Sequence, residues 1–154
     1  MVKWTPIKSD RDISSLLAAT FGFHDSHLIN LFYRSGDQRV EKGIAFGAQE
    51  EHLLFIQFAS NWYPQTLELC FSGVRKYQIA GFQKYYSSEI SDCYLKFHHD
   101  IYRFSSERLI VWADRYGFNP QSENQNDLMH EPMISYIVAD QLKWRFVDSD
   151  TDQN

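Results

Sequence analysis

The chain has 154 residues, of which 44% are hydrophobic, and its formal net charge at pH 7 is −5. This length corresponds to one domain, which we expect over residues 1–148, followed by a polar tail at 149–154. The acidic balance, without a long run of Lys and Arg, excludes nucleic acid as an expected partner. The sequence has no apolar run long enough to cross a membrane and no signal-peptide pattern, so we expect a cytoplasmic protein without a membrane partner.

A helix is predicted over residues 10–20. Ser9 can cap its first turn, where acidic side chains also favour the helix dipole. Gly22 can end the helix in a left-handed conformation. Apolar side chains recur at helical spacing, namely Ile13, Leu16, Leu17 and Phe21.

The following residues have the pattern of strands. Aromatic residues make up 16% of the chain, and aromatic side chains favour a pleated, half-buried surface. Residues 27–34 and 39–47 flank a turn and are predicted to pair as a hairpin. Residues 53–59 form a continuous apolar run typical of a central strand. Pro64 is expected to interrupt the strand pattern before the alternating segment 66–71.

The second half of the chain continues this pattern. Residues 92–104 and 108–113 are predicted as short strands, and residues 115–131 as a long polar loop. Residues 136–147 alternate between apolar and polar side chains, which marks an antiparallel strand with one solvated face. Long helices between strands are absent from the pattern, which disfavours a parallel sheet. We therefore expect a mainly β (α+β) protein, an antiparallel β-sandwich or partly open barrel with one N-terminal helix.

Two groups of histidine and aspartate are candidate metal ligands. They are His24, Asp25 and His27 in the first group, and His98, His99 and Asp100 in the second. Zinc accepts such nitrogen and oxygen ligands, so a site could combine the two groups across the sheet. The favoured interpretation is a polar corner, in which the first group binds main-chain groups as the chain leaves the helix.

No catalytic motif accompanies these groups. The sequence lacks a G-x-S-x-G elbow, a phosphate-binding loop and a dinucleotide glycine motif. Cys70 and Cys93 are expected to be reduced, and Cys70 is expected to act as a small hydrophobic residue rather than a nucleophile. Cys93 is five residues from His98, too far along one strand for the two side chains to meet without the rest of the fold. We expect no cofactor, and enzymatic activity is not the favoured function.

The N-W-Y-P stretch is a candidate binding segment. Trp62 and Tyr63 lie near a turn, where exposed rings can stack on a sugar or anchor a protein partner, and Asn61 could add hydrogen bonds. The alternative is that one ring of the pair closes the end of the β structure.

Three stretches carry a resemblance to known proteins. They are F-H-D-S at 23–26, L-C-F-S-G-V at 69–74 and Y-I-V-A-D-Q-L-K-W-R-F at 136–146. With the order of elements, they resemble a loose group of small bacterial proteins, some of which are immunity proteins that neutralise a toxin. The resemblance spans most of the chain and implies a protein partner but no catalytic residue.

The favoured function is a non-catalytic binding protein, in one version an immunity-type inhibitor of a toxin. A small metal-dependent hydrolase that uses the His and Asp groups, or a carbohydrate- or small-ligand-binding module that uses Trp62 and Tyr63, are the alternatives. An exposed strand edge would also allow a homodimer.

Overall fold

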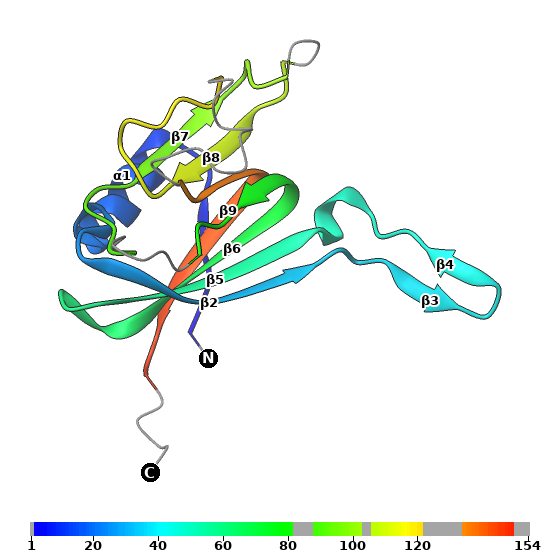
Figure 1. The fold of residues 1–154 in the computed structure, drawn as a ribbon, viewed down its shortest axis with the longest axis horizontal. Coiled ribbons are helices and arrows are strands. Elements are labelled where there is room, and N and C mark those ends of the chain that lie inside the picture. Colours follow the sequence, from blue (N-terminus) through cyan, green and yellow to red (C-terminus); the bar gives the residue numbers. More distant parts are fainter. Residues whose placement is uncertain (1, 82–87, 103–105, 122–133, 150–154) are drawn as a thin grey trace.

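The computed structural model describes residues 2–81, 88–102, 106–121 and 134–149, and Figure 1 shows their arrangement. This part of the chain forms one α-helix, α1 (Asp10–Ala19), and two 3-10 turns, η1 (Phe21–Phe23) and η2 (Gln49–Glu51). Its strands are β1 (Thr5–Ile7), β2 (Ser26–Arg34), β3 (Gln38–Val40), β4 (Gly43–Ala45), β5 (Leu53–Ser60), β6 (Tyr63–Gln78), β7 (Tyr94–His98), β8 (Leu109–Ala113) and β9 (Tyr136–Val147). With ten residues, α1 is too short to cross a bilayer. No other helix in the described ranges is long and apolar enough to do so.

Seven strands form one open, antiparallel sheet. Its order is β2-β5-β6-β9-β8-β7. One edge of β9 pairs with β6, whereas the other pairs with β8 over its first half and with β1 over its second half. The prediction of a mainly β, antiparallel fold with one N-terminal helix is confirmed. The fold has the form of one open sheet that does not close into a barrel, rather than the two packed sheets of a sandwich, since the only other strands among the described residues, β3 and β4, are exposed along their whole length.

The helix begins at the predicted residue because Ser9 caps it. Ser9 Oγ accepts a hydrogen bond from the Asp12 backbone N–H (3.3 Å), and the Asp12 carboxylate accepts one from the Ser9 N–H (2.9 Å). This reciprocal pair is a capping box. Ile13 and Leu16 are buried and hold the helix against the sheet. Gly22 has the predicted positive φ, 66°, but lies in η1 rather than at the helix C-cap.

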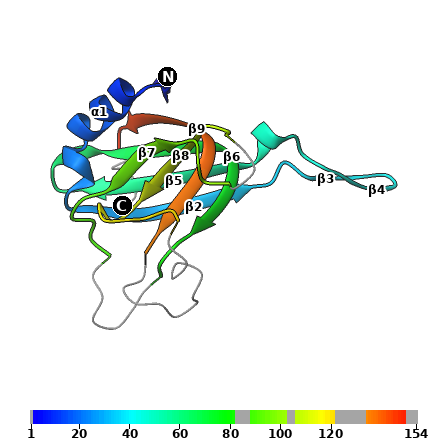
Figure 2. The same cartoon turned by 90° about the horizontal axis from the view of Figure 1, so that it is seen from above.

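The main core lies between α1 and one face of the sheet, and Figure 2 shows the helix on that side. The alternating segment 66–71 lies in β6 and places one face in this core, where Leu67, Leu69 and Phe71 are all fully buried. Trp112 of β8 is fully buried in the same core, where its ring contacts that of Phe23 at a centroid distance of 6.1 Å. A smaller apolar cluster covers the opposite face of β8, so this strand is buried on both sides.

The hairpin predicted between residues 27–34 and 39–47 is wrong. β2 pairs with β5, from Ser26 opposite Ser60 to Arg34 opposite Leu53. The chain between them forms a separate hairpin, β3–β4, which projects beyond the ends of β2 and β5 (Figures 1 and 2). The pairing with β5 wins because it is longer and lies over the buried core. Residues 35–48 are called the arm below.

Most of the remaining predicted strands fall close to their expected positions, but the strand expected up to residue 104 ends at His98, and Ile101 and Tyr102 are not in a strand. The apolar run 53–59 is β5, which lies one place from the sheet edge rather than at the centre. The expected break occurs as a turn at residues 61–62, and Pro64 is the second residue of β6. The closing strand 136–147 is confirmed as β9, but the expected solvated face is missing from its first four residues. Tyr136–Ala139 are all buried, because the smaller apolar cluster covers the face opposite the main core. Parts of three predicted segments, residues 103–104, 122–131 and 150–154, lie outside the described residues.

Candidate functional site

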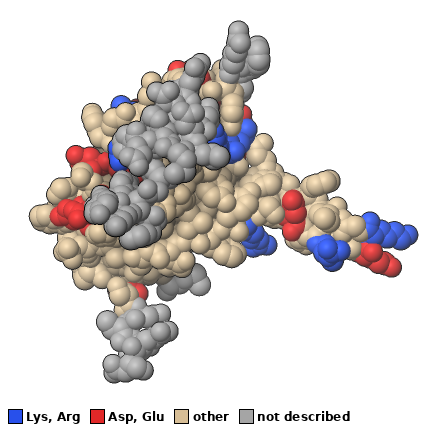
Figure 3. All heavy atoms as spheres, viewed as in Figure 1, with Lys and Arg blue, Asp and Glu red and all other residues tan. Residues whose placement is uncertain are grey.

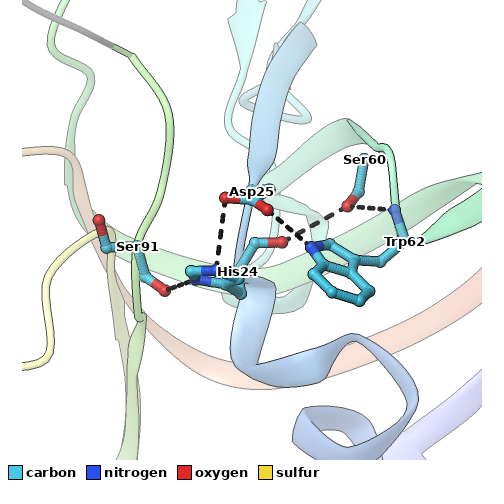
Figure 4. A network of polar contacts seen from close by, with 5 residues as sticks. All are labelled: His24, Asp25, Ser60, Trp62 and Ser91. Atoms are coloured by element: carbon cyan, nitrogen blue, oxygen red, sulfur yellow. Dashed lines mark hydrogen bonds and ion pairs between the residues drawn. The ribbon is translucent and has the colours of Figure 1, made fainter.

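The F-H-D-S motif forms a corner where four segments of the chain meet (Figure 4). His24 Nδ1 lies 2.8 Å from the Ser91 carbonyl oxygen, and the Trp62 indole N–H donates to the Asp25 carboxylate (2.7 Å). Ser60 Oγ donates to the His24 carbonyl oxygen (3.4 Å) and accepts from the Trp62 backbone N–H (3.1 Å). These contacts join η1, the start of β2, the β5–β6 turn and the segment before β7.

The backbone at this corner is strained. Phe21, Phe23 and Asp25 have φ angles of 52°, 65° and 53°, a conformation that costs about 1–3 kcal/mol for each non-glycine residue. Two kinds of contact enforce it. Phe23 is fully buried against Trp112, and the Asp25 N–H donates to the Ile90 carbonyl oxygen (2.9 Å). The corner is therefore a fixed structural element that ties neighbouring segments together.

The ionisable groups of the corner influence one another. The pKa of Asp25 is lowered, first by the Trp62 indole N–H and then by a hydrogen bond with Glu89. The pKa of Glu89 is raised because it shares that hydrogen bond and is repelled by the Asp25 charge. The pKa of His24 is raised chiefly by its hydrogen bond with the Ser91 carbonyl oxygen. His24 and Glu89 are exposed, so water screens their charges. The arrangement of His24, Asp25 and Glu89 is that of a polar corner.

The two groups of predicted metal ligands stay separate. His98 Nε2 lies 2.6 Å from Tyr94 Oη, and His98 Nδ1 lies 3.4 Å from the Asp100 carboxylate. Within the described ranges, no group of three or more His, Cys, Asp and Glu side chains is arranged to hold a metal ion. The predicted combination of His24 or His27 with the second group is thus not assembled.

The N-W-Y-P stretch divides into an exposed and a buried ring. Trp62 is 53% exposed and packs beside Phe21 at a centroid distance of 5.3 Å. Tyr63 is buried, and its hydroxyl is 3.0 Å from the Ser26 hydroxyl. Asn61 is exposed in the turn. Only Trp62 of the two rings is therefore available to a partner, and Tyr63 has the core position that the alternative predicts.

Both cysteines are buried free thiols. Burial raises the pKa of Cys93 to about 12 and also raises that of Cys70. The thiolate is the nucleophilic form of cysteine, so neither side chain is suited to covalent catalysis at neutral pH.

The arm carries a surface that the sequence did not indicate. Val40, Ile44 and Phe46 are exposed by 46%, 60% and 87%. Figure 3 shows charged side chains of both signs along the arm, and its sequence includes Arg39 and Glu41. Every residue of its two strands is exposed. These apolar side chains therefore do not belong to either core cluster.

A tight neck joins the arm to the body of the molecule. A Cβ on Gly47 would lie 2.7 Å from the Gly36 carbonyl carbon, so the two segments approach more closely than side chains permit. The Gly47 N–H donates to the Asp37 carboxylate (2.8 Å), and the Ala48 N–H donates to the Glu51 carboxylate (2.7 Å). An isolated two-stranded hairpin is only marginally stable in water, so the neck sets the direction of the arm. The two glycines that bracket residues 37–46 are the one signal of it in the sequence.

Comparison with models of protein families, with curated protein sequences and with solved structures found no match to this chain. Its function is accordingly argued from the contacts and exposure of its own residues.

Proposed function

We propose that this chain is a non-catalytic binding protein that recognises a protein partner through its arm. The observation that carries this proposal is the exposure of Val40, Ile44 and Phe46 on a hairpin that projects from the body. Neighbouring exposed apolar side chains on a soluble protein mark an interaction surface, because their burial against a partner removes apolar area from water.

The arm offers two kinds of contact to a protein. Ile44 of β4 lies directly opposite Arg39 of β3, so these two side chains share one face of the hairpin. Phe46 follows directly after β4. This face places an arginine beside an exposed apolar side chain, and it suits an apolar groove with an acidic residue at its edge. The outer edges of β3 and β4 also present main-chain groups that a strand of a partner can pair with.

Within this class of function, the resemblance to small bacterial proteins favours an immunity-type inhibitor whose partner is a toxin. A narrow arm with apolar side chains can enter a cleft of the toxin while the body stays outside it. The net charge of −5 adds a general attraction to a basic toxin. No catalytic group is required for this activity.

The test co-expresses the chain with a secreted toxin encoded beside it and measures growth and co-purification. The wild-type chain should rescue growth, and the double variant Ile44→Asp with Phe46→Ala should not. Tyr116→Ala is the matched control, because Tyr116 is 71% exposed and lies outside the arm; this variant should rescue growth. Thermal melts would establish that each variant is folded.

Other outcomes would contradict parts of the proposal. Full rescue by the double variant would remove the arm from recognition. Failure of the wild-type chain to rescue growth or co-purify would remove the immunity version. A second copy of this chain is a competing partner: a wild-type dimer that the double variant converts to monomers in sedimentation would assign the arm to self-association.

A further inference from the structure

A groove of about 210 Å³ lies on the face of the sheet that points away from the main core. It crosses β2, β5, β6 and β9. The groove lies outside the arm, and its lining alternates along each strand with the side chains of the core. Two rows of side chains line it. The polar row is Asn30, Gln57, Glu68 and Arg145, and the aromatic row is Phe32, Phe55 and Trp4.

The polar row follows the register of the sheet. Asn30 is opposite Gln57, Gln57 is opposite Glu68, and Glu68 is opposite Arg145. The Asn30 amide N–H donates to Gln57 Oε1 (3.2 Å), and the Gln57 amide N–H donates to Glu68 Oε1 (2.8 Å). The Arg145 Nε–H donates to Glu68 Oε2 (2.6 Å). These bonds hold all four side chains in fixed positions before any ligand arrives.

The polar row keeps capacity for a ligand. A side-chain amide has two N–H donors, and the contacts within the row use one from Asn30 and one from Gln57. Each Glu68 oxygen accepts one bond from the row and has a second lone pair. Donors and acceptors therefore alternate along the groove. This arrangement suits a ligand with hydroxyl groups, because each hydroxyl can donate one hydrogen bond and accept another.

The aromatic row lies beside the polar row. Phe32 and Phe55 are each two residues from a member of the polar row and so share its face. The ring of Phe55 lies 6.4 Å from that of Phe32 and 6.5 Å from that of Trp4. The guanidinium of Arg145 lies 4.2 Å from the Trp4 ring centroid and holds the indole in place. Phe32 is 60% exposed, so its ring is open to a ligand.

We propose that this groove binds a single neutral sugar ring. The C–H face of a pyranose would pack on the aromatic row, and its hydroxyls would bond to the polar row. Glu68 and Arg145 form an ion pair with each other, so the two charged side chains that line the groove balance. Lys143 lies beside the groove, with its ammonium 5.0 Å from the Trp4 ring centroid, and the charged comparator in the test below measures its influence. Its volume lies below the roughly 300–1,000 Å³ of sites for drug-sized ligands, which limits the ligand to about one ring. This activity is separate from partner recognition by the arm and goes beyond it.

The test is saturation-transfer NMR with D-glucose, D-galactose, D-mannose and N-acetyl-D-glucosamine, and with D-glucuronate as a charged comparator. At least one neutral sugar should receive saturation, and glucuronate should receive less. Phe32→Ala and Asn30→Ala should each weaken binding by about tenfold, the equivalent of one stacking or hydrogen-bonding contact. Phe46→Ala is the matched control, because Phe46 is 87% exposed on the arm and should leave sugar binding unchanged.

Three results would overturn the proposal: no saturation transfer to any neutral sugar, equal transfer in the wild-type chain and both groove variants, or a preference for glucuronate. The first result would mean that the side chains of the polar row form hydrogen bonds only with one another and bind no sugar. The experiment is independent of the toxin test, since arm variants should lose the partner and keep the sugar, whereas Asn30→Ala should do the reverse.

Discussion

The body and the arm of this molecule place their large apolar side chains in opposite environments. In the body, Phe58 is fully buried and packs on Trp112 at a centroid distance of 5.5 Å. On the arm, Phe46 is 87% exposed, and hydrogen bonds at the neck hold the hairpin in place. The core that stabilises the fold and the surface proposed for recognition therefore lie in different segments, which makes the two roles separable by mutation.

The largest expected effect is the difference in stability between alanine variants of these two phenylalanines. Phe58→Ala leaves a cavity in the core and should lower the free energy of unfolding by about 3–5 kcal/mol. Phe46→Ala removes an exposed ring and should change it by less than about 0.5 kcal/mol. Urea denaturation of both variants measures the difference. Similar losses in the two variants would mean that the arm packs on the body, which would contradict its exposure.

A pH effect of intermediate size is expected from Asp114, which follows β8 in the body. Burial raises the pKa of Asp114 from 3.8 to about 6, and its Oδ1 has no hydrogen-bond partner among the described residues. The unfolded chain ionises first as the pH rises. The free energy of unfolding should therefore fall between about pH 4 and pH 6, by at most about 3 kcal/mol.

Asp114→Asn should abolish this slope, so that stability at pH 7 rises relative to stability at pH 4. Urea denaturation at four pH values between 4 and 7 would measure it. Glu41→Gln, a change on the exposed arm, is the control and should keep the wild-type slope. An unchanged slope in Asp114→Asn would assign the pH dependence to another group.

The sequence predicted those parts of the fold that depend on local signals. The helix was predictable because its cap and its apolar spacing lie within a few residues of Ser9. The buried faces of β6 and of the second half of β9 were predictable because side chains alternate along any strand, whereas Tyr136–Ala139 of β9 are buried on both faces. The pairing of β2 was not predictable, because the turn at residues 35–38 is equally compatible with a hairpin between β2 and residues 39–47. Burial of β5, which is further along the chain, favours the pairing of β2 with β5 instead.

The candidate site divides in the same way. Asp25 was predicted to lie in a polar corner from its position after the helix and its capacity to accept hydrogen bonds. Its partners were not predictable, since Ser91 is 67 residues from His24 and only the fold brings Glu89 to Asp25. The sequence also could not show which of Trp62 and Tyr63 is buried, because both flank the same turn.

A smaller effect is expected at the start of α1. Ser9→Ala removes the side chain that caps the Asp12 N–H and should lower the free energy of unfolding by about 1 kcal/mol. Ser14→Ala is the matched control, because Ser14 Oγ donates to the Asp10 carbonyl oxygen within the helix (3.0 Å) and that bond adds little to stability. Urea denaturation measures both variants. Equal effects would mean that the cap does not stabilise the helix.

The smallest effect on stability, together with a large effect on recognition, is expected at the neck of the arm. In Gly47→Ala the new methyl group would collide with the backbone of Gly36 and redirect the arm. Because the arm strands are exposed and bury no core side chain, movement of the arm can relieve the collision, and the free energy of unfolding should fall by less than about 1 kcal/mol. Partner binding should nevertheless be lost. Gly81→Ala is the control, since a methyl group there meets no atom of the described residues within 4 Å.

Amide chemical shifts would show how far the perturbation at the neck extends. Changes confined to residues 35–51, together with an unaltered β5–β6 region, would establish that the neck alone orients the arm. Changes that spread through β5 would mean that the neck belongs to the cooperative unit of the body. In that case a partner that binds the arm would also stabilise the sheet. The temperature at which the sheet unfolds would then rise with partner concentration.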